Sequence, residues 1–445
     1  MSVPKADDGG RPHCVVVGAG HAAASLCAAL VQLKWSGRIT VVGDEPRGPY
    51  HRPPLSKAML AADAKHDAEP DPLRPAAFYD DHGIALRTGT RVTAIDRAAR
   101  TLTLAGGDTL GYDTLVLATG STHRRPPVPG IDTPGVFTLQ TADDAARLRA
   151  RVAAALAAAG DRPEVSPPRA VIVGAGFIGL EAAASLRGRG LDVTVLEMGD
   201  RVLGRVTSPV VSDFYAALHR GRGVDLRLQT SAAKVEAAGD DPGDGLRVTT
   251  SAGDTLDAAV VVVGAGATPN DQLARDAGLA IAEGEGAARG GVTVDAFNRT
   301  SDEHIYAVGD CCRQPAALYE GAPLRLESVQ NANDQAKTAA AAIAGDPKPH
   351  RALPWFWSDQ YDVKLQIAGI NTGYDEAVVR GTPAVGEAFS VFYLKAGQLL
   401  AVDAVNDARA YALGSRLIPA GGRPDPALLA DVSATPKSIL DSAKE

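Results

Sequence analysis

The chain has little cysteine for its length. Its 445 residues include four cysteines, Cys14, Cys27, Cys311 and Cys312, which form neither a CxxC pair nor a zinc-binding spacing with the nine histidines. This excludes a disulfide-stabilised scaffold and predicts no metal site. Low cysteine content is typical of proteins in a reducing compartment, so we expect a cytoplasmic location.

An excess of positive charge and long apolar runs are also missing. Lys and Arg number 45 against 53 Asp and Glu, a formal charge of -8, so nucleic acid is not an expected partner. No apolar run approaches the length that crosses a membrane, and residues 1–13 lack the apolar core of a signal peptide. We therefore expect no membrane partner. The 45% hydrophobic content indicates a folded protein of about three domains.

A glycine-rich turn follows the first apolar segment of the chain. Residues 14–17 are short and mostly β-branched, residues 18–23 read GAGHAA, and an apolar helical stretch comes next. A second apolar segment, 38–42, ends just before Asp44, about twenty residues beyond the glycines. This order of strand, glycine turn, helix, strand and acid predicts a βαβ unit that binds a dinucleotide.

The same pattern recurs in the middle of the chain. Residues 170–173 precede GAGFIG at 174–179, and a further strand, 192–196, ends at Glu197. In such a turn the first glycine permits a tight bend, the second lets the backbone approach a pyrophosphate, and the third packs helix against strand. The acid binds a ribose diol. We therefore predict two nucleotide sites, formed by Gly18, Gly20, Ala23 and Asp44 and by Gly174, Gly176, Gly179 and Glu197.

Strand-like segments beyond each turn extend the repeat. Segments 112–118 and 259–263 are apolar and lead into small-residue turns, and segment 304–310 ends at Asp310. Taken alone, Asp310 is more typical of a turn or helix cap than of a binding site. Residues 388–394 and 398–405 alternate as strands do, which predicts a small antiparallel β domain with terminal helices.

Three longer motifs are more restrictive than the glycine turns. They are PYHRPPLSK at 49–57, LESVQNA at 326–332 and PWFWSDQY at 354–361. In these motifs the chain resembles the FAD-dependent ferredoxin reductases that serve bacterial haem-thiolate monooxygenases and Rieske oxygenases. The resemblance extends from about residue 15 to about residue 437.

This resemblance implies both fold and activity. The fold is α/β, with two Rossmann-like dinucleotide-binding domains in the glutathione-reductase-like arrangement and a C-terminal α+β interface domain. FAD would be bound by residues 11–126 and 264–346 and NAD by 127–263, and the last domain would span 347–445. The implied activity is that of an NADH-dependent ferredoxin reductase. Hydride passes from NADH to FAD, and single electrons then pass to a [2Fe-2S] ferredoxin that supplies an oxygenase.

The resemblance also implies roles for individual residues. Lys57 matches a lysine beside the flavin ring and Glu181 a carboxylate beside the nicotinamide, and we expect them to form an ion pair at the reaction centre. Taken alone, Lys57 would be a solvated lysine and Glu181 an ordinary helix residue. Gln140 departs from the family, because many relatives have arginine there, so this FAD contact loses its charge. The implied FAD contacts are Gly18, Gly20, Ala22, Ala23, Asp44, Lys57, Val92, Ala118, Gln140, Asp310, Val329 and Trp357, and the implied NAD contacts are Gly174, Gly176, Gly179 and Glu197.

Charge near the second turn predicts NADH as the reductant. Glu197 would repel the 2′-phosphate of NADPH, and Asp200 adds a second carboxylate. Arg201 is the residue that tempers this prediction, since it is close enough in sequence to reach a phosphate.

The cysteine pattern narrows the chemistry further. Disulfide reductases that share both nucleotide units use an early CxxxxC pair, and residues 50–57 contain no cysteine. Disulfide reduction by that route is therefore excluded. Cys311 and Cys312 are expected to be small buried thiols.

The electron acceptor is predicted from the family alone. A ferredoxin would dock near Lys337, where relatives have a basic residue, although a solvated helix lysine explains Lys337 equally well. Rubredoxin or another acceptor is an alternative. A second alternative is an NADH-responsive flavoprotein module similar to apoptosis-inducing factor.

Overall fold

The computed structural model describes residues 10–61, 69–160, 166–239, 244–283 and 290–443. Residues 1–9, most of the segment judged for a signal peptide, lie outside the described residues. The chain divides into two compact units. Unit 1 comprises Met1–His51, Asp71–Thr122 and Thr268–Ala352, and unit 2 comprises Arg52–Pro70, His123–Ala267 and Leu353–Glu445.

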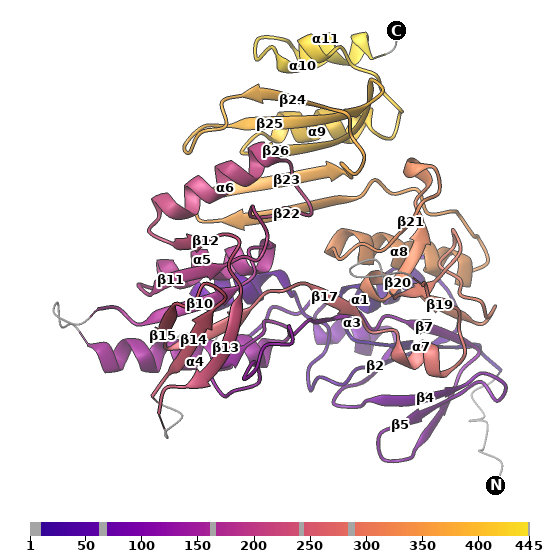
Figure 1. The fold of residues 1–445 in the computed structure, drawn as a ribbon. Helices are drawn as coiled ribbons and strands as arrows, with labels where there is room; N and C mark the ends of the chain where they lie inside the picture. Colours follow the sequence, from indigo (N-terminus) through magenta and orange to yellow (C-terminus); the bar gives the residue numbers. More distant parts are fainter. Residues whose placement is uncertain (1–9, 62–68, 161–165, 240–243, 284–289, 444–445) are drawn as a thin grey trace. The chain divides into compact units, whose positions relative to one another are not determined.

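A five-stranded parallel sheet forms the centre of unit 1, in the order β19-β7-β1-β2-β3. Three of its strands, β19, β7 and β2, are labelled in Figure 1. All of β1 is buried, and its side chains alternate between two cores because successive strand residues point to opposite faces. Cys14 and Val16 pack with α1 and α8, whereas Val15 and Val17 pack with β4 and β5. The elements are β1 (His13–Val17), α1 (His21–Gln32), β2 (Arg38–Val42), α3 (Ala76–Asp81), β3 (Ala85–Arg87), β7 (Thr114–Leu117), β19 (Ile305–Ala307) and α8 (Val329–Ile343).

Two smaller sheets complete unit 1. An antiparallel sheet in the order β4-β5-β6 shares a core with the parallel sheet, and β18, β20 and β21 form a second three-stranded sheet. The elements are β4 (Val92–Asp96), β5 (Thr101–Leu104), β6 (Thr109–Gly111), α7 (Gln272–Asp276), β18 (Val292–Thr293), η3 (Gly309–Cys311), β20 (Cys312–Pro315), η4 (Ala317–Tyr319) and β21 (Pro323–Leu324).

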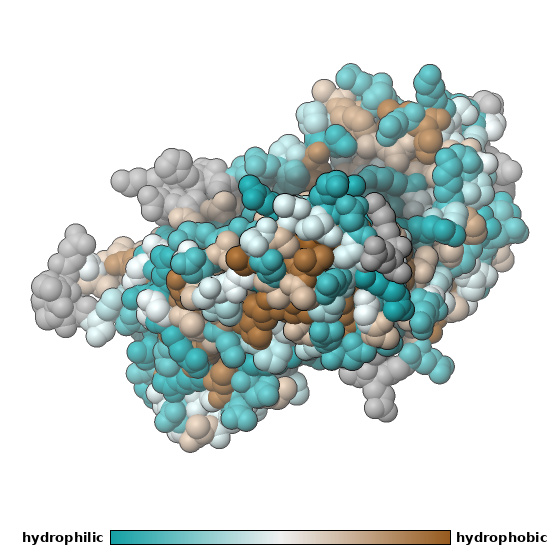
Figure 2. All heavy atoms as spheres, turned by 90° about the horizontal axis from the view of Figure 1, so that it is seen from above, coloured by the Kyte–Doolittle hydropathy of each residue, from teal (hydrophilic) through white to brown (hydrophobic). Residues whose placement is uncertain are grey.

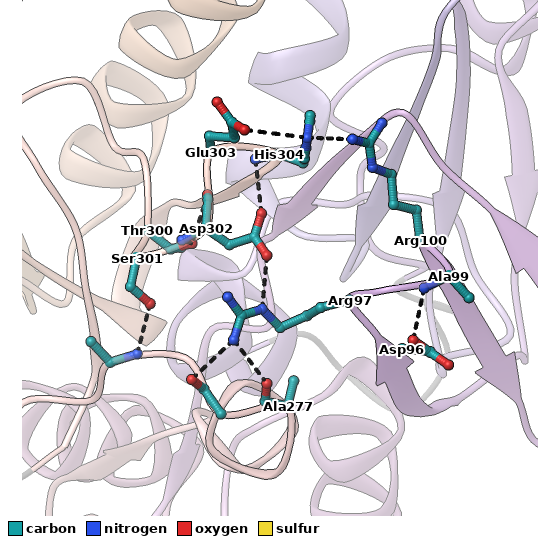
Figure 3. A network of polar contacts seen from close by, with 12 residues as sticks. Asp96, Arg97, Ala99, Arg100, Ala277, Thr300, Ser301, Asp302, Glu303 and His304 are labelled. Carbon is teal, nitrogen blue, oxygen red and sulfur yellow. Dashed lines mark hydrogen bonds and ion pairs between the residues drawn. The ribbon is translucent and has the colours of Figure 1, made fainter.

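An ionic network joins the β4–β5 hairpin to two distant segments of unit 1 (Figure 3). Arg97 donates from Nε to Oδ2 of Asp302 at 2.7 Å and from Nη1 to the carbonyl of Gly278 at 3.2 Å. Asp302 also accepts from the backbone N–H of His304 at 3.0 Å. Burial acts to raise the pKa of Asp302, but the hydrogen bonds from Arg97 and His304 outweigh it and the pKa lies below its ordinary value.

Unit 2 repeats the parallel sheet, in the order β12-β11-β10-β16-β9. Strand β16 is a run of four valines, all buried, as expected for a strand covered on both faces. The antiparallel strands β13, β14 and β15 cover one face. The elements are β9 (Val136–Phe137), α4 (Ala142–Ala159), β10 (Arg169–Val173), α5 (Phe177–Gly188), β11 (Asp192–Leu196), α6 (Pro209–Gly221), β12 (Asp225–Arg227), β13 (Ala232–Ala237), β14 (Leu246–Thr250), β15 (Thr255–Ala258) and β16 (Val260–Val263).

The C-terminal part of unit 2 is a five-stranded antiparallel sheet, in the order β22-β23-β26-β25-β24 (Figure 1). Phe392 and Leu394 of β25 pack with α9, whereas Phe389 of the same strand packs against Phe214 of α6, with ring centroids 5.0 Å apart and the ring planes inclined by 59°. The predicted small β domain with terminal helices is therefore confirmed. Its elements are β22 (Trp355–Gln360), β23 (Val363–Gly369), β24 (Glu376–Gly381), β25 (Phe389–Lys395), β26 (Gln398–Val405), α9 (Ala408–Leu417), α10 (Pro426–Ala430) and α11 (Pro436–Ser442).

Short elements lie where the chain passes from one unit to the other. The 3-10 helix η1 (Pro53–Ser56) and helix α2 (Ala58–Ala61) belong to unit 2, and the short strands β8 (Ser121–His123) and β17 (Ala267–Pro269) are at unit boundaries.

The surface mixes polar and apolar residues. Hydrophobic residues form several areas separated by hydrophilic ones on the face shown in Figure 2. In the part of the chain that the structure describes, no helix is both long and apolar enough to cross a lipid bilayer. The exposed large hydrophobic side chains are Leu33, Met198, Val206, Tyr374, Val385 and Val432.

Candidate functional site

The glycine turn of unit 2 has the geometry that a pyrophosphate requires. Gly174 has a φ of +104°, and a Cβ there would lie 2.5 Å from the carbonyl oxygen of Gly264. A Cβ at Gly179 would lie 2.0 Å from the carbonyl oxygen of Gly174. Gly176, the N-cap of α5, faces open space and has no capping side chain. The first amides of this helix are therefore available to an anion.

The glycine turn of unit 1 differs at its third position. Gly18 has a φ of +108°, and a Cβ there would lie 2.1 Å from the carbonyl oxygen of Ala118, the residue after β7. Gly20 is the N-cap of α1 and also lacks a side-chain cap. Ala23 carries its Cβ in the core and is 0% exposed. Ala22 is buried beside it, so both small residues lie in the first turn of α1 with their side chains in the core.

The two acids are held differently. In unit 2, Glu197 accepts from the backbone N–H of Ala175 at Oε2 and from that of Gly199 at Oε1, both at 2.7 Å. In unit 1, Asp44 pairs with Arg91 at 2.9 Å, and both side chains are more than half exposed. Glu197 is therefore fixed against the glycine turn, whereas Asp44 is a solvated carboxylate.

Lys57 and Glu181 form the predicted ion pair inside unit 2. Lys57 directly follows η1, Glu181 lies in α5, and the distance from Nζ to Oε1 is 2.8 Å. Glu181 is 5% exposed, and a buried carboxylate is costly without partners. Ser56 donates to its Oε2 at 2.6 Å and Ser358 donates to its Oε1 at 2.6 Å. Three donors thus satisfy this carboxylate.

Sequence reasoning missed Ser56 and Ser358. Both lie inside motifs that were recognised as wholes, PPLSK and WFWSDQ. The signal for Ser56 was its place beside Lys57. Ser358 had no comparable signal, because its contact with Glu181 joins residues 177 positions apart.

Other predicted cofactor residues lie in unit 1. Asp310 is in η3 directly beyond β19 and accepts from Ser121 Oγ at 2.9 Å. Val329 opens α8, and Val92 opens β4. Asp310 therefore lies in a 3-10 turn at the end of a parallel strand, the edge of such a sheet where ligands bind.

Gln140 and Trp357 belong to unit 2. Gln140 Oε1 accepts from the backbone N–H of His123 at 2.9 Å, and its carbonyl accepts from Arg52 at 2.7 Å. Trp357 lies in β22, with its ring 5.4 Å from that of Trp355. The Gln140 side-chain amide thus forms a hydrogen bond to the backbone of His123, and this bond needs no charge on the side chain.

All four cysteines are buried free thiols. Burial raises the pKa of Cys14, Cys311 and Cys312, and raises that of Cys27 to about 12. Such thiols are protonated and poor nucleophiles. Across the described ranges, no three His, Cys, Asp or Glu side chains gather as metal ligands would.

Comparison with known proteins decides the family. The family model for pyridine nucleotide-disulphide oxidoreductases matches residues 12–336, and a model for the reductase C-terminal domain matches residues 355–440. The chain belongs to the pyridine nucleotide-disulphide oxidoreductases. FAD and a nicotinamide dinucleotide are the cofactors of this family, and they fit the two glycine turns described above.

Several of these oxidoreductases are similar over most or all of their length. Rhodocoxin reductase of Rhodococcus erythropolis is 43% identical over 91% of this chain and 88% of the relative. The ferredoxin reductase subunit of 5,5'-dehydrodivanillate O-demethylase from Sphingobium is 42% identical over 97% of this chain and 100% of the relative. The crystal structure of the covalent putidaredoxin reductase–putidaredoxin complex matches with a TM-score of 0.88 and 38% identity, over 97% of this chain and 99% of that chain. The predicted family and fold class are therefore confirmed.

Proposed function

We propose that the chain is an NADH-dependent ferredoxin reductase that contains FAD and supplies electrons to an oxygenase through a [2Fe-2S] ferredoxin. The observation that carries this proposal is the 42% identity, over 97% of the chain, to a ferredoxin reductase subunit of an O-demethylase. The buried thiols and the absence of cysteine from residues 50–57 support it, because they leave no solvent-accessible dithiol to reduce a disulfide.

The residues that would hold the cofactors fit their chemistry. We assign the FAD contacts to Gly18, Gly20, Ala22, Ala23, Asp44, Lys57, Val92, Ala118, Gln140, Asp310, Val329 and Trp357, and the NAD contacts to Gly174, Gly176, Gly179 and Glu197. Bound FAD accepts two electrons together and releases them singly. Lys57 supplies a positive charge where negative charge develops on reduction, and Glu181 holds that charge in place.

NADH is the proposed reductant because Glu197 is held in place and the nearby Arg201 already has hydrogen-bond partners. Glu197 is oriented by two backbone amides, which suits a ribose diol and opposes a phosphate. Arg201 donates to the carbonyl oxygens of Thr207 and Gly204 and to Ser212 Oγ, at 2.6–3.0 Å. Arg201 therefore braces its own loop against α6 and would have to leave these acceptors to bind a 2′-phosphate.

The partner, the domain limits and the location are also proposals. We place ferredoxin docking near Lys337, whose side chain is 63% exposed beside Asp334. We retain the division into an FAD domain (11–126 and 264–346), an NAD domain (127–263) and a C-terminal domain (347–445). Buried free cysteines support a cytoplasmic location.

The test is an anaerobic titration of the purified protein with NADH and, separately, with NADPH. We expect NADH to bleach the flavin at lower concentration, and oxidised [2Fe-2S] ferredoxin to restore its absorbance. Absence of bound flavin, or a flavin that NADH does not reduce, would overturn the proposal. Reduction by NADH followed by reoxidation with rubredoxin alone would replace the acceptor.

A further inference from the structure

A chain of buried polar side chains leads away from Glu181 inside unit 2. Ser358, which donates to Glu181, accepts in turn from Nε2 of Gln360 at 3.2 Å. Gln360 Oε1 lies 2.8 Å from Nε2 of His219, and His219 Nδ1 lies 3.4 Å from the Tyr361 hydroxyl. Ser358, Gln360 and His219 are 0%, 1% and 0% exposed. Their hydrogen bonds are therefore made within the protein.

The chain joins three elements of unit 2. Ser358 and Gln360 are two residues apart on β22, so their side chains share one face of the strand. Glu181 lies in α5 and His219 in α6. A strand of the C-terminal sheet thus links the helix that carries the catalytic carboxylate to a second helix.

The chemistry of these groups determines which atom donates in each hydrogen bond. An amide oxygen only accepts, so His219 must carry a proton on Nε2 to bond with Gln360. Burial holds the pKa of His219 below its ordinary value, which keeps the ring neutral. Gln360 then donates to Ser358, and Ser358 donates to Glu181. Every donor points toward the carboxylate that pairs with Lys57.

Polar networks are costly in a core unless each member is bonded. Each member of this one is bonded, and its terminal bond, O–H to carboxylate at 2.6 Å, has the length of a strong charge-assisted hydrogen bond. Oε1 of Glu181 receives both this bond and the Lys57 ammonium. Ser358 and Ser56, which donate to opposite oxygens, therefore together fix the rotation of the carboxylate on which Lys57 depends.

We propose that Ser358, Gln360 and His219 are positioning residues, which hold Glu181 and through it Lys57 in the arrangement used for flavin reduction. The inference rests on the proposed function, because it assigns these residues to that same site. Ser358 acts directly on Glu181, and Gln360 and His219 act through Ser358. The effect of substitution should therefore decline along the chain.

The test measures the rate constant of flavin reduction by NADH in anaerobic stopped flow, with the NADH dissociation constant obtained separately. Ser358→Ala is expected to lower the rate constant about tenfold, and His219→Leu about threefold, with little change in NADH affinity. Ser358→Thr keeps the hydroxyl and is expected to restore most of the rate. In a Glu181→Ala background, Ser358→Ala should have almost no further effect, because the acceptor of the Ser358 hydroxyl is already gone.

Ser390→Ala is the matched control. Ser390 is also 0% exposed in the same sheet and donates to a carboxylate, Asp407, at 2.7 Å. It should lose stability like Ser358→Ala and keep the wild-type rate constant. A second readout is the isotope-edited infrared carboxylate band of Glu181, which Ser358→Ala should shift and Ser390→Ala should not.

The outcomes separate this inference from the proposed function. Equal rate constants for Ser358→Ala and Ser390→Ala, an unshifted Glu181 band, or full additivity of Ser358→Ala with Glu181→Ala would overturn the positioning role. Wild-type flavin that NADH does not reduce would instead overturn the proposed function. If Ser358→Thr fails to fold, the double-mutant cycle still decides.

Discussion

The two nucleotide units have the same strand, turn and helix arrangement, but their acidic residues occupy different positions in it. Gly18 donates to the carbonyl of Val42 at 2.8 Å, and Gly174 donates in the same way to Leu196 at 2.8 Å. This register puts the residue after Leu196, Glu197, level with Gly43 and not with Asp44. A Cβ at Gly43 would lie 2.6 Å from Cβ of Ala19. The acid of unit 1 therefore comes one residue later, away from the turn and into solvent.

The same glycine-turn pattern in the sequence therefore corresponds to two different local structures. Unit 2 has a bare third glycine and an acid held by two backbone amides. Unit 1 has an alanine and a solvated acid paired with an exposed arginine. The first is a tightly fitted site, and the second is a looser one in which the chain tolerates side-chain bulk.

The largest difference should appear at the third position of the turn. Gly179→Ala places a Cβ 2.0 Å from a backbone oxygen and is expected to cost about 3 kcal/mol of unfolding free energy and most NADH affinity. Ala23→Gly, the reverse change in unit 1, should cost about 1 kcal/mol, as for glycine in a helix. Urea unfolding and NADH titration measure both. Equal costs would remove the distinction between the units.

The next largest difference is expected between two ion pairs, one in each unit, in their contribution to the free energy of unfolding. Asp302 of unit 1 is 14% exposed with several donors, whereas Asp257 of unit 2 is 75% exposed beside Arg247. We expect Asp302→Asn to cost about 2 kcal/mol at pH 7 and Asp257→Asn under about 0.5 kcal/mol.

The Asp302 effect should also depend on pH. Its folded pKa lies below the ordinary 3.8, so its stabilisation is complete above that value and is lost as the pH falls through the folded pKa. Urea unfolding at pH 7 and near pH 3 checks the sign. A gap between wild type and Asp302→Asn that widens toward acid would contradict it.

Substitutions of the two acidic residues should affect different cofactors, Glu197 the binding of NADH and Asp44 the binding of FAD. Glu197→Gln removes the charge that two amides hold in place, so NADH affinity and the preference over NADPH should each fall about tenfold. Asp44→Asn should weaken FAD retention by a smaller factor, since Arg91 and solvent already screen that charge. Flavin bleaching and flavin fluorescence give the two affinities. A larger loss from Asp44→Asn would reverse the assignment of tight and loose sites.

A small, pH-dependent effect is expected from buried histidines, which occur in both units. Burial lowers the pKa of His13 in unit 1 and of His219 in unit 2. The unfolded chain binds a proton below about pH 6.5 while the folded ring does not, so stability falls as pH falls. His219→Gln should recover up to about 1 kcal/mol of this loss at pH 5.5 relative to pH 8. Urea unfolding at the two pH values checks this, with His13→Gln as the counterpart.

Much of the fold was predictable because its signals are local. The strand, glycine turn and helix of each unit follow from short apolar segments and bare glycines, and β25 and β26 follow from alternation. The Lys57–Glu181 pair came from family resemblance and not from spacing. The register offset between Asp44 and Glu197 could not be predicted, since it depends on contact between Gly43 and Ala19. The link from His219 through Gln360 to Ser358 also depends on tertiary contacts.

Each unit is formed by three separate segments of the chain, so its parts leave the ribosome at different times. Glu181 leaves the ribosome 177 residues before Ser358, an interval of roughly 10–35 s at ordinary elongation rates. During that interval the helix that carries Glu181 lacks one of its three donors and the strand that covers it. The hydrogen-bonded surroundings of Glu181 are therefore completed late, and a chain halted before β22 would hold both glycine turns without the Ser358 donor.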